Sequence, residues 1–547
     1  MVPMPPTAAT PVKSFHPRDV VTPAHASRPT PALPVVSDGA HSTRSPRRVD
    51  VATPRGPSWP TSLPPTPVTR QRRLGILAIC CTSLFIVFID NTIVNVALPS
   101  IGRDFHTTLP GLKWIVDGYT LVLASLFMLA GSTADRLGRR RVFMTGLTLF
   151  VLGSLACSLA PSLAWLVFFR MLQAVGGSML NPVAMSIIRN TFDDHRERAR
   201  AIGIWGAVTG IALALGPILG GLLVQSVGWR SIFWVNIPIG VCAFILTAAY
   251  IPESRAPTPR RIDPIGQVLV TLILASTTYA IIEGPGRGWS SGEIIGLFLV
   301  AGAGLTTLVP YELRRHDALV EVRFFKSVPF SGATVIAVAS FFAFGGFLFL
   351  NTLYLQDARG LSALAAGVDT LPMAGAMALF SSLSGRVVGR FGARPSLVLA
   401  GIAMGTGSYL LTSLSQTTSF THLFVAYVIF GIGFGTVNAP ITNTAVSGMP
   451  ASQAGVASAI ASTSRQIGQT LGVGVVGSAL AAGLGQGTFS RHFASTTHQD
   501  WWLLSACGGL VLLLGFLSTS TWALRTAYRT SLHLDVTDES PALTGTT

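Results

Sequence analysis

Fourteen apolar runs of about 20 residues dominate the sequence. A helix needs about 20 mostly apolar residues to cross the hydrocarbon core of a bilayer, so each run predicts a membrane-spanning helix. The predicted spans are residues 74–98, 112–134, 142–160, 163–188, 202–224, 232–251, 264–283, 291–311, 328–355, 365–385, 396–414, 420–446, 455–484 and 501–524. Only 11% of the 547 residues are charged, whereas a soluble domain carries about 25%. The sequence therefore predicts an all-α polytopic membrane protein and excludes a soluble globular enzyme.

The positive charges lie in short clusters between these spans. With fourteen spans both chain termini lie on one side, which holds 30 of the 38 Lys and Arg residues against six on the other side. Loops rich in Lys and Arg stay in the cytoplasm, so we expect both termini there and the protein in the cytoplasmic membrane. The net charge of +15 thus reflects topology, and we expect no nucleic-acid partner.

The segment before the first span differs from the rest of the chain. Residues 1–73 hold 16 of the 34 prolines and ten basic residues against three acidic ones, without apolar periodicity. Such a segment buries too little surface to offset its ordering entropy, so we expect a disordered cytoplasmic tail. Two interpretations stay open: a basic tail that contacts anionic lipid, or an extension without function, including a mis-assigned start site.

The loop after the second predicted span is repeated after the tenth. Residues 131–141 and 385–394 share a glycine, an arginine five residues on, a glycine two residues later and a following basic residue. An offset of eight spans implies two six-span units with two inserted spans, and parallel six-span halves are a transporter architecture. The predicted divisions are a tail (1–73), a first half (74–251), an inserted segment (252–327), a second half (328–524) and a C-terminal tail (525–547).

Four stretches carry a family resemblance. They are Ile89–Pro99 in the first span, Gly131–Arg141 after the second, Arg170–Gly177 in the fourth and Gly216–Gly221 in the fifth. Together they resemble the signatures of the major facilitator superfamily, specifically its fourteen-span drug–proton antiporters of the EmrB/QacA type, over about residues 74–524. Two positions depart from the pattern, since Thr133 stands where Leu is usual and Ala174 where Gly is usual.

The resemblance implies a function for the whole chain. It implies a proton-coupled exporter of lipophilic, often cationic, drugs or antibiotics that works by alternating access and is not an enzyme. Its partners would be a small-molecule drug or antibiotic, protons and the lipid bilayer; we expect a monomer with no cofactor beyond the proton gradient and no metal. Alternatives are a dedicated self-resistance exporter of one natural product, an importer or uniporter of a polar metabolite, and a sensor or scaffold on the same fold.

Three ionisable residues lie inside the first, second and fourth predicted spans: Asp90, Asp117 and Arg170. At 1.5 Å per residue all three lie about 8–12 Å below the predicted outer surface, so we expect them to share one layer. Ionisable groups in hydrocarbon are costly and indicate function. We expect Asp90 and Arg170 to couple transport to protons; the alternative is a structural ion pair. For Asp117 a proton-coupling role and a role without coupling are equally open. The resemblance implies that an acid at this position reads substrate charge, and the other alternative is an interfacial Asp exposed to water.

Further candidates for substrate recognition are polar or aromatic residues within the spans. They are Asn91, Asn95, Tyr119 and Arg465. For Arg465, in the middle of the thirteenth span, contact with substrate and a structural ion pair are equally open. All ten histidines lie in tails, in loops or at span ends, so we expect no histidine proton relay.

Two glycine-containing motifs are the remaining candidates. By resemblance, the loop after the second span is a conformational latch, made of Gly131, Asp135, Arg136, Gly138, Arg139 and Arg140. The alternative is arginines that only hold the loop in the cytoplasm. The antiporter motif of the fifth span comprises Gly210, Gly216, Pro217, Gly220 and Gly221. Its glycines allow close packing of the two halves, which would limit leak, or ordinary helix packing without that role.

Overall fold

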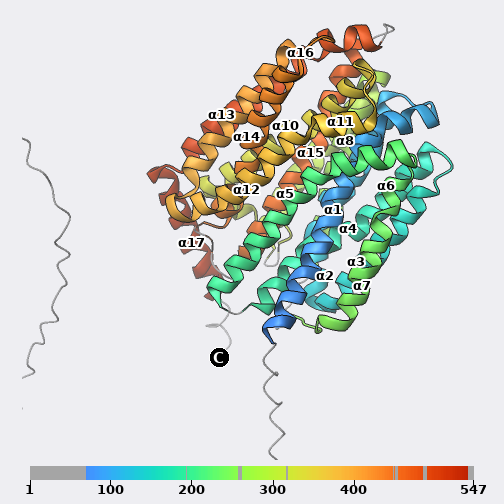
Figure 1. Cartoon of the computed structure of the whole chain (residues 1–547). Coiled ribbons are helices and arrows are strands. Elements are labelled where there is room, and N and C mark those ends of the chain that lie inside the picture. Colours follow the sequence, from blue (N-terminus) through green and yellow to red (C-terminus); the bar gives the residue numbers. More distant parts are fainter. Residues whose placement is uncertain are drawn as a thin grey trace, which may run out of the picture. The chain divides into compact units, whose positions relative to one another are not determined.

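The computed structural model describes residues 69–192, 194–256, 262–315, 318–447, 449, 454–484 and 489–539, which are helical and contain no strand. The helices are α1 (Arg70–Phe105), α2 (Leu109–Leu137), α3 (Arg139–Ser158), α4 (Leu163–Thr191), α5 (His195–Ser226), α6 (Ser231–Trp234), α7 (Asn236–Tyr250), α8 (Pro264–Arg287), α9 (Gly292–Arg314), η1 (Val322–Lys326), α10 (Val328–Leu353), η2 (Tyr354–Ala358), α11 (Ala363–Asp369), α12 (Leu371–Phe391), α13 (Ala393–Leu410), η3 (Leu411–Ser413), α14 (Phe420–Val446), α15 (Ala454–Leu484), α16 (Phe489–Ser518) and α17 (Thr521–Glu539) (Figure 1).

Thirteen helical segments of the described ranges are long and apolar enough to cross a membrane. The predicted span at residues 455–484 coincides with α15, a helix of 31 residues that is not among the thirteen. α15 packs against α2, α8 and α10, and it buries Gln469, Thr470 and Ser478. A helix surrounded by other helices does not need a lipid-compatible composition. The all-α membrane fold is confirmed, and the count of fourteen spans stays a prediction.

Polar side chains just before several helices explain where those helices begin. The side chain of Asp263 accepts a hydrogen bond from the backbone N–H of Gly266, at 3.0 Å, and Pro264 is the first residue of α8. Ser419 caps α14 in the same way through the N–H of His422. Such caps satisfy backbone donors that the first turn of a helix leaves unpaired, so the apolar runs begin as helices at these points.

The helices pack in two groups that meet along a shared seam. In the first group α1 packs against α4, α5 and α7, and α3 packs against α4 and α7. In the second group α10 packs against α14, α15 and α16, and α13 packs against α14 and α16. The seam consists of α2 against α15 and of α5 against α11 and α12 (Figure 1). The predicted domain boundaries stay predictions.

The two helices of the predicted inserted segment lie on one side of this seam. α8 packs against both α2 and α15, and α9 packs against α8. α8 therefore contacts a helix of each group. We call the end of the bundle where α1 begins the proximal end and the end where α1 finishes the distal end.

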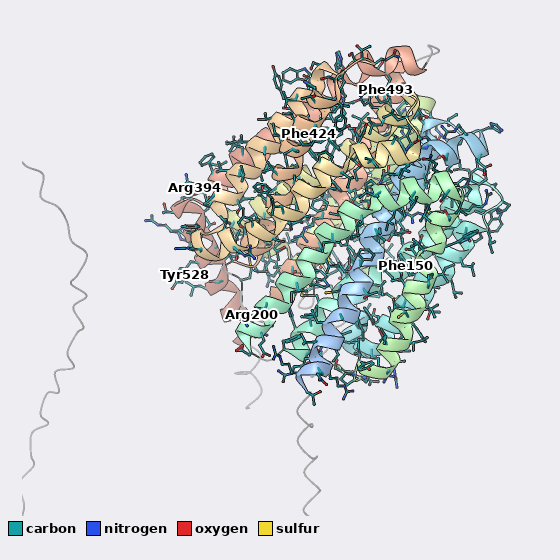
Figure 2. The ribbon with its side chains drawn as sticks, in the orientation of Figure 1. Phe150, Arg200, Arg394, Phe424, Phe493 and Tyr528 are labelled. Carbon is teal, nitrogen blue, oxygen red and sulfur yellow. The ribbon has the colours of Figure 1, made fainter. Side chains whose placement is uncertain are left out.

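Apolar side chains cover the outward faces of the helices. Exposed examples are Trp165, Leu299, Leu379, Phe424 and Leu513, whereas Phe150 is buried inside (Figure 2). A contiguous apolar exterior suits lipid tails and would be unfavourable in water. The interior instead contains charged and amide side chains, which form the candidate site.

Candidate functional site

Asp90 and Arg170 form an ion pair in the interior of the first group of helices. Nη1 of Arg170 on α4 lies 2.5 Å from Oδ2 of Asp90 on α1, and both side chains are at most 1% exposed. The other carboxylate oxygen, Oδ1, accepts hydrogen bonds from Gln173 Nε2 at 2.9 Å and from Asn236 Nδ2 at 2.8 Å. Three donors, one of them charged, stabilise the ionised form of the Asp90 carboxylate.

Aromatic and polar groups from α2, α3 and the α6–α7 region enclose this pair. The ring of Tyr119 lies against the Arg170 guanidinium, with Cζ of Arg170 3.9 Å from the ring centroid. Ser154 accepts a hydrogen bond from Asn236 at 3.1 Å. A cation over an aromatic face is attracted by the ring quadrupole, and the attraction grows when water is excluded. Tyr119, which the sequence predicts as a substrate contact, thus packs against the Arg170 guanidinium in this conformation.

Sequence reasoning did not identify Gln173 and Asn236 as partners of Asp90. A signal existed for Gln173, because a residue three positions after Arg170 lies on the same helix face. Asn236 is a polar residue in an otherwise apolar run at the start of α7. Its pairing with a residue 146 positions earlier could not be read from local spacing.

Asp117 is fully buried on α2 but is not part of the Asp90–Arg170 cluster. Among the described residues neither oxygen of its carboxylate has a hydrogen-bond partner. Lys113, one turn earlier, is also 0% exposed, although it lies at the start of the predicted span 112–134. Asp90 and Arg170 thus meet, whereas Asp117 faces α8 and α15 beside Lys113. The common layer of the three residues stays a prediction.

Amide and hydroxyl groups join the two groups of helices near the middle of the seam. Asn91 and Gln469 exchange two hydrogen bonds, at 2.9 and 3.3 Å, and Thr470 donates to Thr120 at 2.7 Å. Asn95 donates to the carbonyl of Asn91 at 2.9 Å, and its own buried side-chain oxygen has no partner in the described part of the chain. The predicted substrate contacts Asn91 and Asn95 thus lie at the seam.

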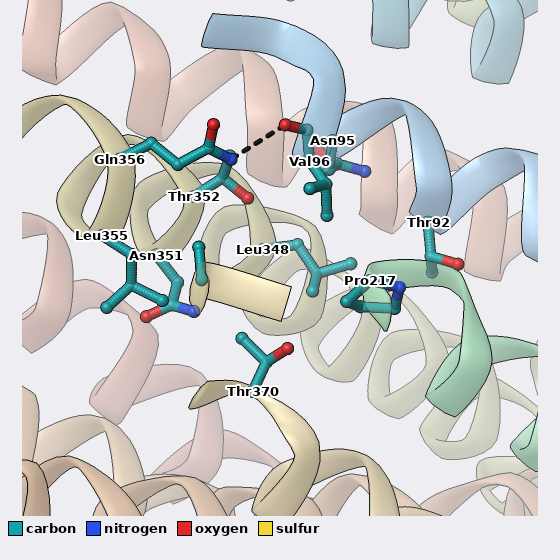
Figure 3. Close-up of a pocket in the computed structure, with 11 residues that line it drawn as sticks. Thr92, Asn95, Val96, Pro217, Leu348, Asn351, Thr352, Leu355, Gln356 and Thr370 are labelled. Atoms are coloured by element: carbon teal, nitrogen blue, oxygen red, sulfur yellow. Dashed lines mark hydrogen bonds between the residues drawn. The ribbon is translucent and has the colours of Figure 1, made fainter. Parts of the chain in front are cut away.

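The distal part of the seam is closed. Nε2 of Gln356 donates to the carbonyl of Val96 at 2.8 Å, across the two groups of helices (Figure 3). Beside this bond lies a cavity of about 10 Å³, lined by Thr92, Asn95, Val96, Pro217, Leu348, Asn351, Thr352, Leu355, Gln356, Ala366 and Thr370 (Figure 3). That volume is about the least that holds one water molecule, so this cavity is too small for a drug-sized molecule.

The glycines of the antiporter motif make the close contacts of α5. A Cβ on Gly216 would overlap the side chain of Thr92 on α1, and one on Gly221 would lie 2.5 Å from the carbonyl oxygen of Ala363 on α11. Gly220 faces Ile93, where a Cβ would lie 2.9 Å from Cγ1. Gly210, by contrast, faces Ala378 of α12 at an ordinary contact distance. The motif thus packs α5 against both groups of helices, while its effect on leak stays a prediction.

The predicted latch connects α2 and α3 to the segment that follows α7. Asp135 accepts two hydrogen bonds from Arg139, at 3.0 and 3.2 Å. The backbone N–H of Arg140 donates to Oε1 of Glu253 at 3.1 Å, and its guanidinium donates to the carbonyl of Ala248 at 2.6 Å.

The other residues of the predicted latch lie close to this contact in the chain. Gly138 adopts φ +112°, and Gly131 lies opposite Pro182 of α4. Arg136, whose side chain is exposed, precedes the turn. Glu253, which the sequence did not single out, is therefore the acidic partner of this loop.

Arg465 on α15 is bound by hydroxyl groups. Its guanidinium donates to Thr442 at 2.6 Å and to Ser462 at 3.4 Å. No ion pair of Arg465 occurs within the described ranges, and its Nε is buried without a partner. The role of Arg465 in substrate contact stays a prediction. No three His, Cys, Asp or Glu side chains of the described chain form a group that fits a metal ion.

Comparisons with known proteins agree with this architecture. The family model of the Major Facilitator Superfamily matches residues 80–473. The multidrug resistance protein Stp of Mycobacterium tuberculosis is 40% identical over 416 residues, which cover 76% of this chain and 77% of that protein. The tetracenomycin C resistance and export protein of Streptomyces glaucescens is 34% identical, over 79% of this chain and 77% of that protein. The methylenomycin A resistance protein of Streptomyces coelicolor is 34% identical, over 81% and 90%.

A solved structure shares the fold at lower identity. The bacterial homologue of the human lysosomal transporter Spinster, in an inward-facing and occupied conformation, is 17% identical and superposes with a TM-score of 0.58. The match covers 85% of this chain and 98% of that one. Given a family model that matches most of the chain and relatives above 30% identity across most of their length, the chain belongs to the Major Facilitator Superfamily of membrane transporters.

Proposed function

We propose that the protein exports lipophilic drugs or antibiotics across the cytoplasmic membrane in exchange for protons. The observation that carries the proposal is the buried ion pair of Asp90 and Arg170, since ionisable groups inside a membrane bundle mark ion or substrate pathways. The names of the relatives, which are a multidrug resistance protein and antibiotic resistance and export proteins, support this class of substrate.

The geometry around Asp90 supports a proton cycle at this carboxylate. Its three donors favour the ionised form in the present conformation. A proton on Asp90 removes the charge that holds Arg170, so protonation weakens the pair and favours a conformation in which the first group of helices is rearranged. Binding and release of the proton at Asp90 thereby bias the two conformations, which is the requirement for coupling.

The distribution of basic residues indicates which end of the bundle faces the cytoplasm. It assigns the proximal end to the cytoplasm and the distal end to the outside, with both termini inside. The bond from Gln356 to Val96 then belongs to an outward gate that is closed. Alternating access would open this gate and close the proximal end. We propose that a monomer carries out the cycle, because each group of helices needed for it lies in one chain.

Two versions of this function differ in the range of substrates. A multidrug exporter accepts many lipophilic compounds, whereas a self-resistance exporter is dedicated to one natural product. A drug panel in an efflux-deficient bacterial host separates them, since the first protects against unrelated compounds and the second against a single chemical class.

The proton cycle is tested by efflux of ethidium, a lipophilic cationic dye, from cells of an efflux-deficient host. We expect Asp90→Asn to abolish efflux against a gradient. The matched control is Asp104→Asn, which removes a half-exposed carboxylate from the distal end of the same helix and should retain efflux. If Asp90→Asn still pumps the dye against a gradient, Asp90 is not the coupling residue.

A further inference from the structure

Lys113 and Asp117 lie one helical turn apart on α2 and face the inserted helix α8 and helix α15. Both side chains are 0% exposed, so two ionisable groups are enclosed between three helices. Residues four positions apart on a helix are neighbours, with Cβ atoms about 5–6 Å apart, so a lysine side chain can reach the carboxylate. In the conformation described here it does not do so.

Lys113 instead binds acceptors on the two facing helices. Its Nζ donates to the carbonyl of Ile282 on α8 at 2.9 Å and to the hydroxyl of Ser478 on α15 at 2.8 Å. The Ser478 hydroxyl donates in turn to the carbonyl of Ile281 at 2.5 Å. The ammonium thus ties α2, α8 and α15 together, and α8 contributes backbone oxygens.

Glycines on α15 make room for both ionisable side chains. A Cβ on Gly477 would lie 2.6 Å from Cδ of Lys113, and one on Gly474 would lie 3.5 Å from Oδ2 of Asp117. The pair is therefore accommodated by small residues at matching positions of the facing helix. A side chain at Gly477 would displace Lys113, whereas Gly474 lies at an ordinary contact distance from Asp117.

Asp117 has no compensation for a negative charge in this arrangement. Neither oxygen of its carboxylate has a partner among the described residues. An isolated ionised carboxylate is very costly in a low-dielectric interior, whereas a neutral carboxylic acid costs far less. Asp90, which has three donors, is the opposite case. Asp90 and Asp117, both fully buried, are thus in different environments in one conformation.

Other charged groups near this pair have their own partners. Glu283 on α8 accepts a hydrogen bond from Trp114 at 2.8 Å and lies 3.7 Å from Arg287. Arg287 also pairs with Glu293, at 2.6 Å. Tyr279 packs its ring against Trp114. From α10 the neighbour of this site is the apolar ring of Phe349, and from α15 it is Ser478 with the glycines. Among the residues that the structure describes, Lys113 is thus the cation placed to pair with Asp117.

Building on the proton exchange proposed above, we propose that Asp117 is a second proton-binding site and that Lys113 is the residue that drives release of its proton. In the present conformation Asp117 holds a proton and Lys113 binds α8 and α15. When α8 and α15 shift relative to α2, Lys113 loses the carbonyl of Ile282 and the hydroxyl of Ser478. The ammonium then pairs with Asp117, whose O–H bond breaks; the proton leaves to water, and Lys113 stays protonated throughout.

In this step the inserted helix α8 controls the release of the proton from Asp117. The carbonyl of Ile282 competes with Asp117 for the same ammonium, so the position of α8 decides whether Asp117 keeps its proton. Asp90 and Asp117 then both bind and release a proton in one transport cycle. The interpretation of Asp117 as a reader of substrate charge, by contrast, assigns no role to Lys113 or to α8.

Infrared spectroscopy of the purified full-length protein tests the step without any substrate. The carbonyl stretch of a protonated carboxyl group is recorded as a function of pH, and the difference from Asp117→Asn isolates the signal of Asp117. We expect this signal at neutral pH. Lys113→Met should move its midpoint to higher pH by at least about one unit, because an adjacent opposite charge shifts a carboxyl group by about one to three units.

Two further variants separate this role from a merely structural one. Ser478→Ala removes one acceptor that holds Lys113 away from Asp117, so its midpoint should move to lower pH, opposite to Lys113→Met. Lys113→Arg keeps the charge and should stay near the wild-type midpoint. The proposal is overturned if no Asp117 signal occurs at neutral pH, or if Lys113→Met and Ser478→Ala shift the midpoint in the same direction or not at all. Because this titration needs no transport, its result is independent of the efflux test on Asp90.

Discussion

The side-chain amides of Asn91 and Gln469 exchange two hydrogen bonds although 378 residues separate them in the chain. Asn91 directly follows Asp90, so this contact between the two groups of helices lies next to the buried ion pair. A conformational change that separates α1 from α15 must break both bonds. The amide pair is therefore one of the contacts that hold the two groups of helices together.

A double-mutant cycle on this pair should show strong coupling. We expect Asn91→Ala and Gln469→Ala each to lower the free energy of unfolding by about 1–3 kcal/mol, because each leaves a buried amide without a partner. The double variant should cost little more than either single one. Thermal unfolding of the purified protein in detergent gives these values, with the exposed Gln71→Ala as a control. Additive costs would mean that the two amides do not interact.

A similar argument applies to Asp90 and Arg170. Removing one partner of a buried ion pair leaves an uncompensated charge, which costs about 3–5 kcal/mol. We expect Asp90→Asn to be destabilised because it leaves Arg170 charged at 1% exposure, and the double variant Asp90→Asn with Arg170→Gln to regain part of that loss. Thermal unfolding in detergent measures both. A double variant less stable than either single one would contradict this account.

The ion pair could be predicted from the sequence, because an acid and an arginine inside apolar runs have few alternatives to pairing. The fold class followed from the lengths of the same runs. Lys113 shows where this reasoning fails. A lysine near a span end usually extends its ammonium to the membrane surface, and the sequence offered no sign that it turns inward. The reason lies in α8, which supplies the carbonyl of Ile282 from 169 residues away.

The contacts of the latch and the contacts of α15 could not be predicted from the sequence, for related reasons. Glu253 reaches Arg140 across 113 residues, and a tertiary contact of this kind leaves no periodic pattern. The polar side chains of α15 weaken its apolar signal, because Gln469, Thr470 and Ser478 face other helices. Hydropathy detects contact with lipid, so it is least informative for the helices that carry the interior polar groups.

The turn at Gly138 should be intolerant of a side chain. Its φ of +112° is a conformation that residues with a Cβ rarely adopt, and a Cβ there would lie 2.5 Å from Oε1 of Glu253. We expect Gly138→Ala to cost about 1–3 kcal/mol and to reduce ethidium efflux. Gly389→Ala is the matched control from the repeated loop, since nothing lies within 4 Å of its Cβ position. Equal efflux by both variants would show that the turn does not depend on Gly138.

The closed distal end gives the last prediction, which concerns Gly221. A Cβ at this position would lie 2.5 Å from the carbonyl oxygen of Ala363, so Gly221→Ala should destabilise the closed conformation by about 1–3 kcal/mol. An energy of that size changes the population of an open state by roughly tenfold or more. Asn95→Cys, in the cavity beside the Gln356–Val96 bond, reports this opening through its reaction rate with a polar thiol reagent.

The measurement needs a background without the exposed cysteine, which Cys242→Ser provides. In that background Gly221→Ala should raise the labelling rate of Asn95→Cys by roughly tenfold. Gly210→Ala is the matched control on the same helix, because its Cβ would meet α12 no closer than 3.5 Å, and it should leave the rate unchanged. Both variants add the same methyl group, and they differ only in the backbone that this methyl group contacts. If both variants are labelled at the same rate, α5 does not hold the distal seam closed through Gly221.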